Sequence, residues 1–226
     1  MSDTYPPSPE IAANAHVNAA KYDEMYAASI ADPVAFWGEQ GKRVDWIKPF
    51  TKVKDVSYDF GNVGINWYSD GTLNVSANCI DRHIATRGDK TAIIFEPDNP
   101  DEGSQHISYT ALGLAVNRMA NILKDMGVSK GDRVVLYMPM IPEAAYAMLA
   151  CARIGAIHSI VFAGFSPDAL AARINGSDAK VLITADFAPR GGKATPLKSN
   201  ADAALAACKD TVKYLVVKRT GGDTTW

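Results

Sequence analysis

Two short runs in this chain of 226 residues carry groups suited to ligand binding. Arg190-Gly191-Gly192-Lys193 sets two cations beside a Gly-Gly backbone that an anion can approach closely, which is the chemistry of a phosphate clamp. Phe162-Ala163-Gly164-Phe165-Ser166 leaves small residues between two Phe side chains, with room for a planar ring on the backbone. Each run also has a plainer interpretation: the first as a solvated loop, the second as a tight strand-to-helix turn.

The sequence shows no further motif for nucleotide binding, metal binding or acid–base catalysis. The sequence has neither the P-loop pattern Gly-x-x-x-x-Gly-Lys-Ser/Thr nor the dinucleotide pattern Gly-x-Gly-x-x-Gly. Cys79, Cys151 and Cys208 are widely spaced and include no Cys-x-x-Cys pair, which favours reduced thiols over a zinc site. Asp186 is the best single acid, at a strand end, but no partner for it is visible. We therefore predict no catalytic residue and no metal ligand in this chain.

The composition limits the classes of partner. Hydrophobic residues make up 47% of the chain and charged residues 21%, which is typical of a globular protein. A net charge of −2 argues against sequence-independent nucleic-acid binding. No apolar run approaches the roughly 18 residues of a membrane span, and the polar, Pro-rich start lacks a secretory signal. We expect a cytoplasmic protein that binds neither nucleic acid nor membrane.

Hydrophobic periodicity predicts the elements that position the two runs. The first 75 residues read as an irregular, aromatic-rich segment with helices at 18–31 and 33–40. Further along, helices are predicted at 74–87 (Cys79, Ile80 and Ile84 inward), 110–126, 142–154, 167–174 and 199–208, with strands at 91–96, 105–109, 134–138, 156–162, 180–184 and 213–217. The first two of these strands form a hairpin around a polar turn. Asn175-Gly176 is expected to end the helix that begins at Pro167.

The alternation of short apolar strands with helices predicts an α/β fold with βαβ units and a mostly parallel sheet. Right-handed crossovers bring the loops that follow the strands to one edge of such a sheet. Those loops are residues 139–141, 163–166, 186–193 and 219–222. Both candidate runs therefore fall at the edge where α/β proteins build ligand sites.

The chain resembles the acetyl-CoA synthetases, AMP-forming acetate–CoA ligases of the adenylate-forming superfamily, from about residue 18 to residue 217. The first part of the resemblance lies in Asp32-Pro33 with Phe36-Trp37, Asp45-Trp46, Pro49-Phe50 and Trp67-Tyr68-Ser69-Asp70-Gly71, and the second in Gly131-Asp132-Arg133-Val134, Met138-Pro139, Pro142-Glu143, Arg153-Ile154-Gly155-Ala156 and the two candidate runs. It implies a flexible N-terminus (1–17), an acetyl-CoA synthetase-type N-terminal segment (18–80) and the first part of an AMP-binding domain (81–226).

The resemblance also implies a role for the two runs. In that family the segment matching residues 190–193 meets the nucleotide end of CoA, with Arg190 and Lys193 near its phosphates. The turn Phe162-Ala163-Gly164 lies beside the CoA adenine. The implied CoA-binding residues are thus Arg190, Gly191, Gly192, Lys193, Phe162, Ala163 and Gly164. Many members have Gly at the position of Ala163 and Arg at that of Lys193.

Family members join acetate to CoA in two steps. Acetate attacks the α-phosphate of MgATP to give acetyl-adenylate and pyrophosphate, and the CoA thiol then displaces AMP. The resemblance places the phosphate loop, the acetate pocket and the C-terminal lysine downstream of residue 226. We therefore expect an N-terminal fragment that lacks the C-terminal portion of the same enzyme as its partner, and that is inactive alone in both steps.

Two alternatives stay open. The parent enzyme could use propionate or another short acid, which a downstream pocket residue would decide. The chain could instead be a standalone CoA- or nucleotide-binding module, which would require it to unfold cooperatively and reversibly by itself.

Overall fold

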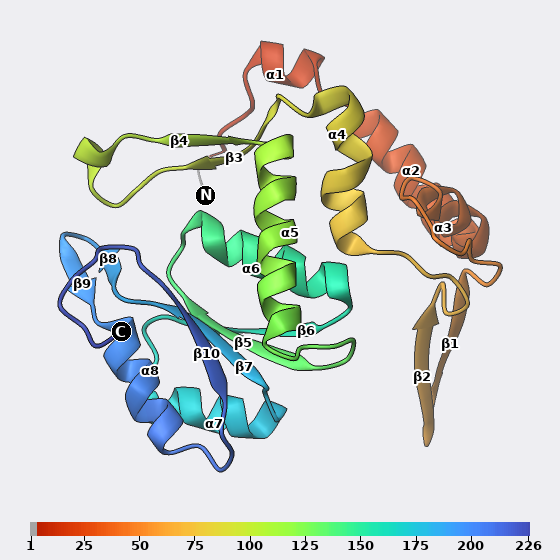
Figure 1. The fold of residues 1–226 in the computed structure, drawn as a ribbon. Helices are drawn as coiled ribbons and strands as arrows, with labels where there is room; N and C mark the ends of the chain where they lie inside the picture. Colours follow the sequence, from red (N-terminus) through yellow and green to blue (C-terminus); the bar gives the residue numbers. More distant parts are fainter. Residues whose placement is uncertain (1–3) are drawn as a thin grey trace. The chain divides into compact units, whose positions relative to one another are not determined.

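The structure, a computed structural model, describes residues 4–226 and divides into two compact units. The first unit ends at Leu73, and the second comprises Asn74–Trp226. Figure 1 shows the elements of both. The two units are described separately below. The domain limits expected from the resemblance, at residues 17/18 and 80/81, stay predictions.

The first unit contains short helices and one hairpin. Its elements are α1 (Pro9–Ala13), α2 (Ala19–Ala31), α3 (Pro33–Gly41), β1 (Lys54–Asp59) and β2 (Asn62–Trp67). The Asp32 carboxylate accepts from the Ala35 N–H at 2.9 Å, and Pro33 occupies the first turn, so α3 begins as the sequence predicts. β1 and β2 pair in antiparallel register.

Aromatic rings pack together where the first unit has no long regular element. The Phe50 ring centroid lies 5.0 Å from that of Trp46 and 4.7 Å from that of Tyr68. Asp70 closes the same region, because its carboxylate accepts from the Thr51 side chain and from two backbone N–H groups. These hydrogen bonds lower the pKa of Asp70 to about 2.

The second unit is built on a four-stranded parallel sheet in the order β10-β7-β5-β6, which confirms the predicted α/β fold. A separate antiparallel hairpin of β3 and β4 precedes it. The elements of the parallel part are β5 (Arg133–Met138), α6 (Pro142–Ile154), β6 (Ile157–Phe162), α7 (Pro167–Ser177), β7 (Val181–Ala185), α8 (Leu197–Ala206) and β10 (Lys213–Val217). Before them lie α4 (Arg82–Arg87), β3 (Thr91–Phe95), β4 (Gln105–Ser108) and α5 (Tyr109–Asp125).

Helices cover both faces of this sheet. Figure 1 shows α5 and α6 on one side and α7 and α8 on the other. Successive residues of a strand point to opposite faces, so Val134 and Leu136 of β5 join the core under α5 and α6. Val135 and Tyr137 join the core under α7 and α8. Burial on both faces is why β5 is apolar without alternation.

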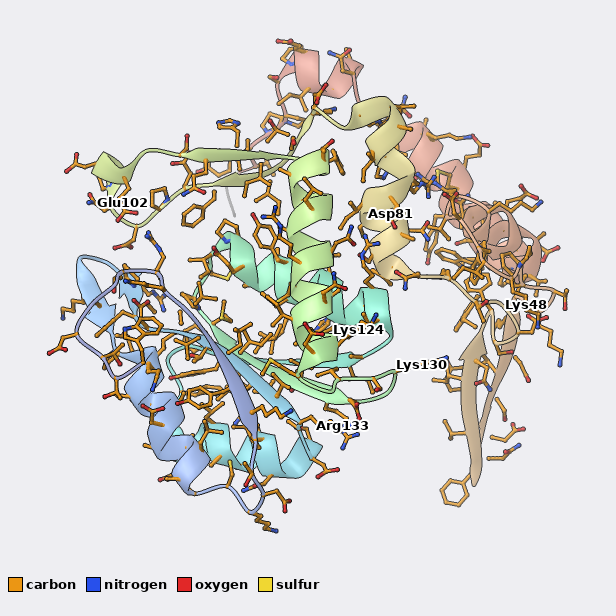
Figure 2. All side chains as sticks on the ribbon, viewed as in Figure 1. Lys48, Asp81, Glu102, Lys124, Lys130 and Arg133 are labelled. Atoms are coloured by element: carbon orange, nitrogen blue, oxygen red, sulfur yellow. The ribbon has the colours of Figure 1, made fainter. Side chains whose placement is uncertain are left out.

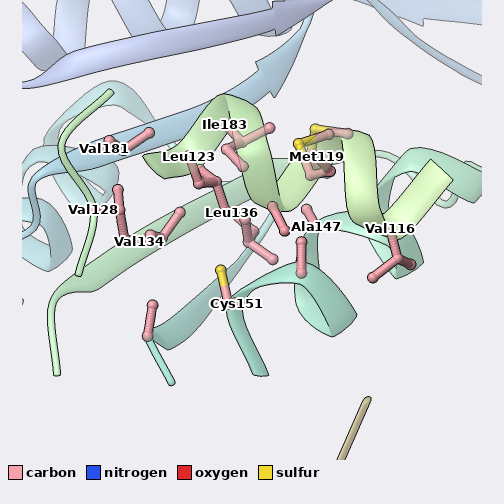
Figure 3. Packing of buried hydrophobic residues seen from close by; sticks show 14 of the residues in the cluster. Val116, Met119, Leu123, Val128, Val134, Leu136, Ala147, Cys151, Val181 and Ile183 are labelled. Carbon is pink, nitrogen blue, oxygen red and sulfur yellow. The ribbon is translucent and has the colours of Figure 1, made fainter. Parts of the chain in front are cut away.

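The core between the sheet and helices α5 and α6 is the larger of the two. Figure 3 shows Val116, Met119 and Leu123 of α5 directed at Leu136 of the sheet and at Ala147 of α6. Of these, Val116, Leu123 and Ala147 are completely buried. The spacing of the α5 residues is the three-to-four repeat from which that helix is predicted.

The sequence-based prediction for residues 74–87 is wrong in one respect. Residues 77–81 form a π-helical turn before α4, not a continuous α-helix. A π turn holds more residues than an α turn, so the side chains rotate out of the expected register. Ile80 is fully buried as expected, but Cys79 is exposed and Ile84 is only partly covered.

The predicted end of the helix that begins at Pro167 is also wrong. α7 continues through Asn175-Gly176 to Ser177, and Asp178 ends it with a φ of 52°. Ile174 is buried against the sheet, and its carbonyl accepts from the Ala179 N–H. That packing outweighs the weak helix propensity of Asn and Gly.

Residues 186–193, expected as a loop, contain regular structure. β8 (Ala188–Arg190) and β9 (Lys193–Thr195) form a two-stranded antiparallel hairpin. No helix within residues 4–226 combines the length and the apolar character needed to cross a membrane.

Candidate functional site

A cavity of about 490 Å³ lies in the second unit at the carboxyl edge of the parallel sheet. Its walls come from the end of β3 and the turn after it, the loop after β5, the end of β6 with its loop, β8, and Arg219 after β10. All four of the loops predicted to share this edge contribute. This is the position at which open α/β sheets bind ligands.

The turn after β6 forms one wall. Phe162, Ala163 and Gly164 all line the cavity, and the Phe162 side chain remains 57% exposed. A Cβ on Gly164 would lie 2.6 Å from the Phe162 ring, so only glycine fits there without a shift of that ring. The Phe162 ring is therefore available as a flat apolar surface.

A buried hydroxyl fixes this turn. Tyr137, fully buried in β5, places its hydroxyl 3.0 Å from the Ala163 carbonyl oxygen and 2.8 Å from that of Phe165. The Asn200 amide of α8 donates to the same hydroxyl at 3.3 Å. Tyr137 looks like an ordinary strand residue in the sequence, and only the sheet register shows that its hydroxyl reaches the turn.

The β8–β9 hairpin contributes another part of the lining. Gly191 and Gly192 occupy its two-residue turn with φ values of 58° and 72°. Two consecutive positive φ values are the requirement of the tight hairpin turn that matches strand twist, and glycine adopts them without steric cost. The two glycines thus shape the turn.

The turn sets Arg190 and Lys193 directly opposite each other. Directly opposed residues share a face of a hairpin, and like charges in that position destabilise it. The Arg190 guanidinium lies 5.9 Å from the centre of the Phe162 ring and lines the cavity. Lys193 is exposed and does not line it. The structure therefore brings Arg190 to the Phe162 turn and leaves Lys193 at the rim.

The two glycine N–H groups are not free. The Asp98 carboxylate accepts from Gly191 N–H at 2.8 Å and from Gly192 N–H at 3.2 Å. These bonds, with the nearby Arg190 charge, lower the pKa of Asp98 below its ordinary value. The anion beside this backbone is a carboxylate of the chain itself, and the expected contact with a phosphate stays a prediction.

Asp186 has backbone partners that the sequence does not reveal. Its carboxylate is fully buried and accepts from the N–H groups of Phe187, Arg219, Thr220 and Gly221 at 2.7–3.2 Å. Burial opposes the charged form, but these hydrogen bonds outweigh it and hold the pKa below the ordinary aspartate value. Asp186 therefore fixes the loop after β10 rather than acting as an acid or base.

That loop delivers Arg219 to the cavity. Its guanidinium pairs with Glu102 at 2.6 Å and lies 5.9 Å from the centre of the Phe95 ring. Figure 2 shows Glu102 at the tip of the hairpin formed by β3 and β4. Arg219 and Asp98 belong to the site although neither is predicted from the sequence. A lone Arg after a strand and an Asp in a polar turn carry no distinctive signal.

The described residues offer no candidate metal centre, and one of the three thiols is buried. No group of three or more His, Cys, Asp or Glu side chains in residues 4–226 could hold a metal ion. Cys151 is buried in the core, and burial raises its pKa to about 12, so its thiol is unreactive at neutral pH.

Comparison with family models decides the family. Residues 80–225 match the model described as AMP-binding enzyme, and residues 22–79 match that of the acetyl-coenzyme A synthetase N-terminus. The chain belongs to the AMP-binding enzyme family. The resemblance on which the sequence-based expectations rest is thereby confirmed at the family level.

Curated relatives in this family are acetyl-coenzyme A synthetases. That of Rhodobacter capsulatus is 65% identical over 212 residues, covering 94% of this chain and 32% of the relative. That of Beijerinckia indica is 60% identical over 228 residues, covering 100% of this chain and 35% of the relative. The chain thus spans about a third of the length of the curated relatives it matches.

A solved structure supports the fold of this AMP-binding family member. The acetoacetyl-CoA synthetase of Streptomyces lividans superimposes with a TM-score of 0.76 at 24% identity. The match covers 87% of this chain and 30% of that one. At that identity it is evidence for the architecture alone.

Proposed function

We propose that this chain supplies the CoA nucleotide subsite of an AMP-forming acetate–CoA ligase. The observation that carries the proposal is that Arg190 and Phe162, at strand ends 28 positions apart in the sequence (190 − 162), line one cavity. A cation beside a flat apolar ring suits a ligand that joins a purine to phosphates. The relatives' printed name, acetyl-coenzyme A synthetase, supplies the substrate.

Different residues of the site would bind different parts of CoA. Phe162, with the uncluttered backbone at Ala163 and Gly164, would receive the adenine. Arg190 would pair with the phosphates through its forked N–H groups, and Lys193 would add a point charge from the rim. An anion bound between them would also relieve the repulsion of two opposed cations on the hairpin.

The reaction proposed for the whole enzyme has two steps. An acetate oxygen attacks the α-phosphorus of ATP and pyrophosphate leaves, and then the CoA sulfur attacks the acetyl carbon and AMP leaves. Mg²⁺ would accompany ATP as part of that substrate. The residues described here take part by holding CoA, so no phosphoryl step is assigned to them.

Two further expectations belong to this proposal. The division into an N-terminal segment and the first part of an AMP-binding domain, near residue 80, is proposed on the limits of the two family matches. A cytoplasmic location is proposed on the three thiols, which are all free of disulfides.

CoA binding to the 226-residue chain tests the proposal. We expect isothermal titration calorimetry to give saturable binding, and Arg190→Ala to raise Kd about 10- to 150-fold, as for loss of a charge-assisted hydrogen bond of about 1.5–3 kcal/mol. Lys193→Ala should raise Kd by a smaller factor, because that side chain lies at the rim.

Lys124→Ala is the matched control. Lys124 is an exposed cation in the last turn of α5 and is labelled in Figure 2. Its removal changes the net charge by the same amount and should leave Kd unchanged. Equal weakening by Arg190→Ala and Lys124→Ala would mean non-specific attraction, and an unchanged chain that binds no CoA would overturn the proposed subsite.

A further inference from the structure

The turn that carries the two cations is held by a distant carboxylate. Asp98 lies 93 positions before Gly191 in the sequence, in the turn between β3 and β4. One of its oxygens, Oδ1, accepts from Gly191 N–H, and the other, Oδ2, accepts from Gly192 N–H. A single carboxylate thus spans both glycines of the turn.

The β8–β9 hairpin needs such an anchor. Each of its strands has three residues, and a lone two-stranded hairpin of that size is marginal in water. The opposed charges of Arg190 and Lys193 weaken it further. The Asp98 carboxylate offsets both problems, because it supplies two hydrogen bonds and a negative charge near Arg190.

The residues that follow Asp98 are themselves held in place. The Asn99 side chain accepts from the Asp101 N–H and caps the short 3₁₀ turn Pro100–Glu102. Glu102 ends that turn and pairs with Arg219 at 2.6 Å. The tip of the β3–β4 hairpin is therefore tied to the loop after β10, and it reaches the glycine turn from a fixed position.

We propose that Asp98 is a positioning residue for the CoA site: it fixes the Gly191–Gly192 turn so that Arg190 and Lys193 are presented to the phosphates. This inference rests on the proposed function. It has one consequence for how the CoA phosphates are recognised. The phosphates are bound by the two side chains and not by the glycine N–H groups, because the carboxylate already occupies those donors.

The opposite arrangement makes a different prediction. If the carboxylate merely stands where a phosphate would bind, CoA must displace it, and removal of Asp98 should strengthen binding. A positioning role requires that removal weaken it. The sign of the change in Kd therefore separates the two.

The experiment measures the turn and the ligand independently in the 226-residue chain. Amide hydrogen exchange by NMR reports Gly191 and Gly192, and calorimetry with CoA reports Kd. In Asp98→Ala we expect exchange at both glycines to quicken at least tenfold and Kd to rise about three- to tenfold. Asp98→Asn should fall between Asp98→Ala and the unchanged chain, because its amide oxygen can still accept from one glycine.

Asp101→Asn is the matched control. It removes the same charge from the same turn, and within residues 4–226 its side chain makes no hydrogen bond to the hairpin. We expect wild-type exchange and Kd from it. Fast exchange in Asp98→Ala with unchanged or tighter CoA binding would overturn the positioning role, as would unchanged exchange.

Failure of the proposed function has a different signature. If the unchanged chain binds no CoA, or if Arg190→Ala binds as well as the unchanged chain, the subsite itself is wrong. Asp98 would then hold a turn that serves no CoA site, and the inference would fall with the proposed function. The exchange data alone would still show whether the carboxylate holds the turn.

Discussion

Single carboxylates anchor the loops at the edge of this sheet. Asp98 holds the glycine turn and Asp186 holds the loop that carries Arg219, in both cases by accepting from backbone N–H groups. Loops with few apolar contacts need such bonds, since hydrophobic burial cannot fix them. Nothing in the sequence distinguishes these two residues from other acids, because their role depends on the backbone N–H groups that the fold places beside them.

Asp186→Asn should destabilise the second unit. One oxygen becomes an NH₂ group that cannot accept, which leaves part-buried N–H groups without partners. Each costs about 1–3 kcal/mol, so we expect a loss of about 2–4 kcal/mol in urea unfolding at pH 7. Asp89→Asn, at an exposed acid, should cost less than about 0.5 kcal/mol. Equal effects of the two would contradict the role of Asp186.

The same substitution has a pH signature with a defined sign. The pKa of Asp186 is lower in the folded chain than in the unfolded one, so the folded state favours the ionised form. Its contribution is complete above the unfolded pKa of about 3.9 and is lost as pH falls through the folded value. The difference between the unchanged chain and Asp186→Asn should be constant from pH 7 to 5 and shrink below about pH 4.

At the scale of elements, buried faces decide where helices stop and which side they present. α7 runs past Asn175-Gly176 because Ile174 packs against the sheet. The π turn at residues 77–81 rotates Cys79 outward while keeping Ile80 buried. In α5 the apolar spacing and the packing agree, and there the predicted helix agrees closely with the observed one.

α5 offers a direct test of that face. Leu123 is fully buried against the sheet, whereas its neighbour Ile122 is 40% exposed. We expect Leu123→Ala to lower the free energy of unfolding by about 2–5 kcal/mol, through lost burial and the cavity left behind. Ile122→Ala is the control and should cost under about 1 kcal/mol. A similar loss from both would mean that the α5 core does not dominate stability; urea titration followed by circular dichroism measures it.

At the scale of the whole molecule, family and activity are separate questions. The chain belongs to the AMP-binding enzymes, and it spans about a third of the length of its curated relatives. The reaction proposed for the whole enzyme also uses ATP and acetate, and no residue described here is assigned to either. The CoA subsite proposed here would thus be one part of a larger active site.

We expect the 226-residue chain to show no acetate-dependent exchange between ATP and pyrophosphate. Exchange requires the first step of the reaction, and none of the residues proposed here acts in it. Radiolabelled pyrophosphate incorporation into ATP measures it, with a full-length acetyl-CoA synthetase as the positive control. Exchange above background would contradict this expectation and would leave the CoA-binding proposal untouched.

The sequence by itself determined the parallel α/β architecture, the order of the main helices and strands of that sheet and the family, because apolar periodicity and local motifs depend on residues close together in the chain. It also marked Arg190–Lys193 and the Phe162 turn as the residues to follow. Only the tertiary structure decided that Arg190 reaches Phe162, that Lys193 lies at the rim and that Tyr137, Asp98 and Asp186 fix the surrounding loops. Those contacts join residues tens of positions apart, and the register of strands and the geometry of turns, not local propensity, bring them together.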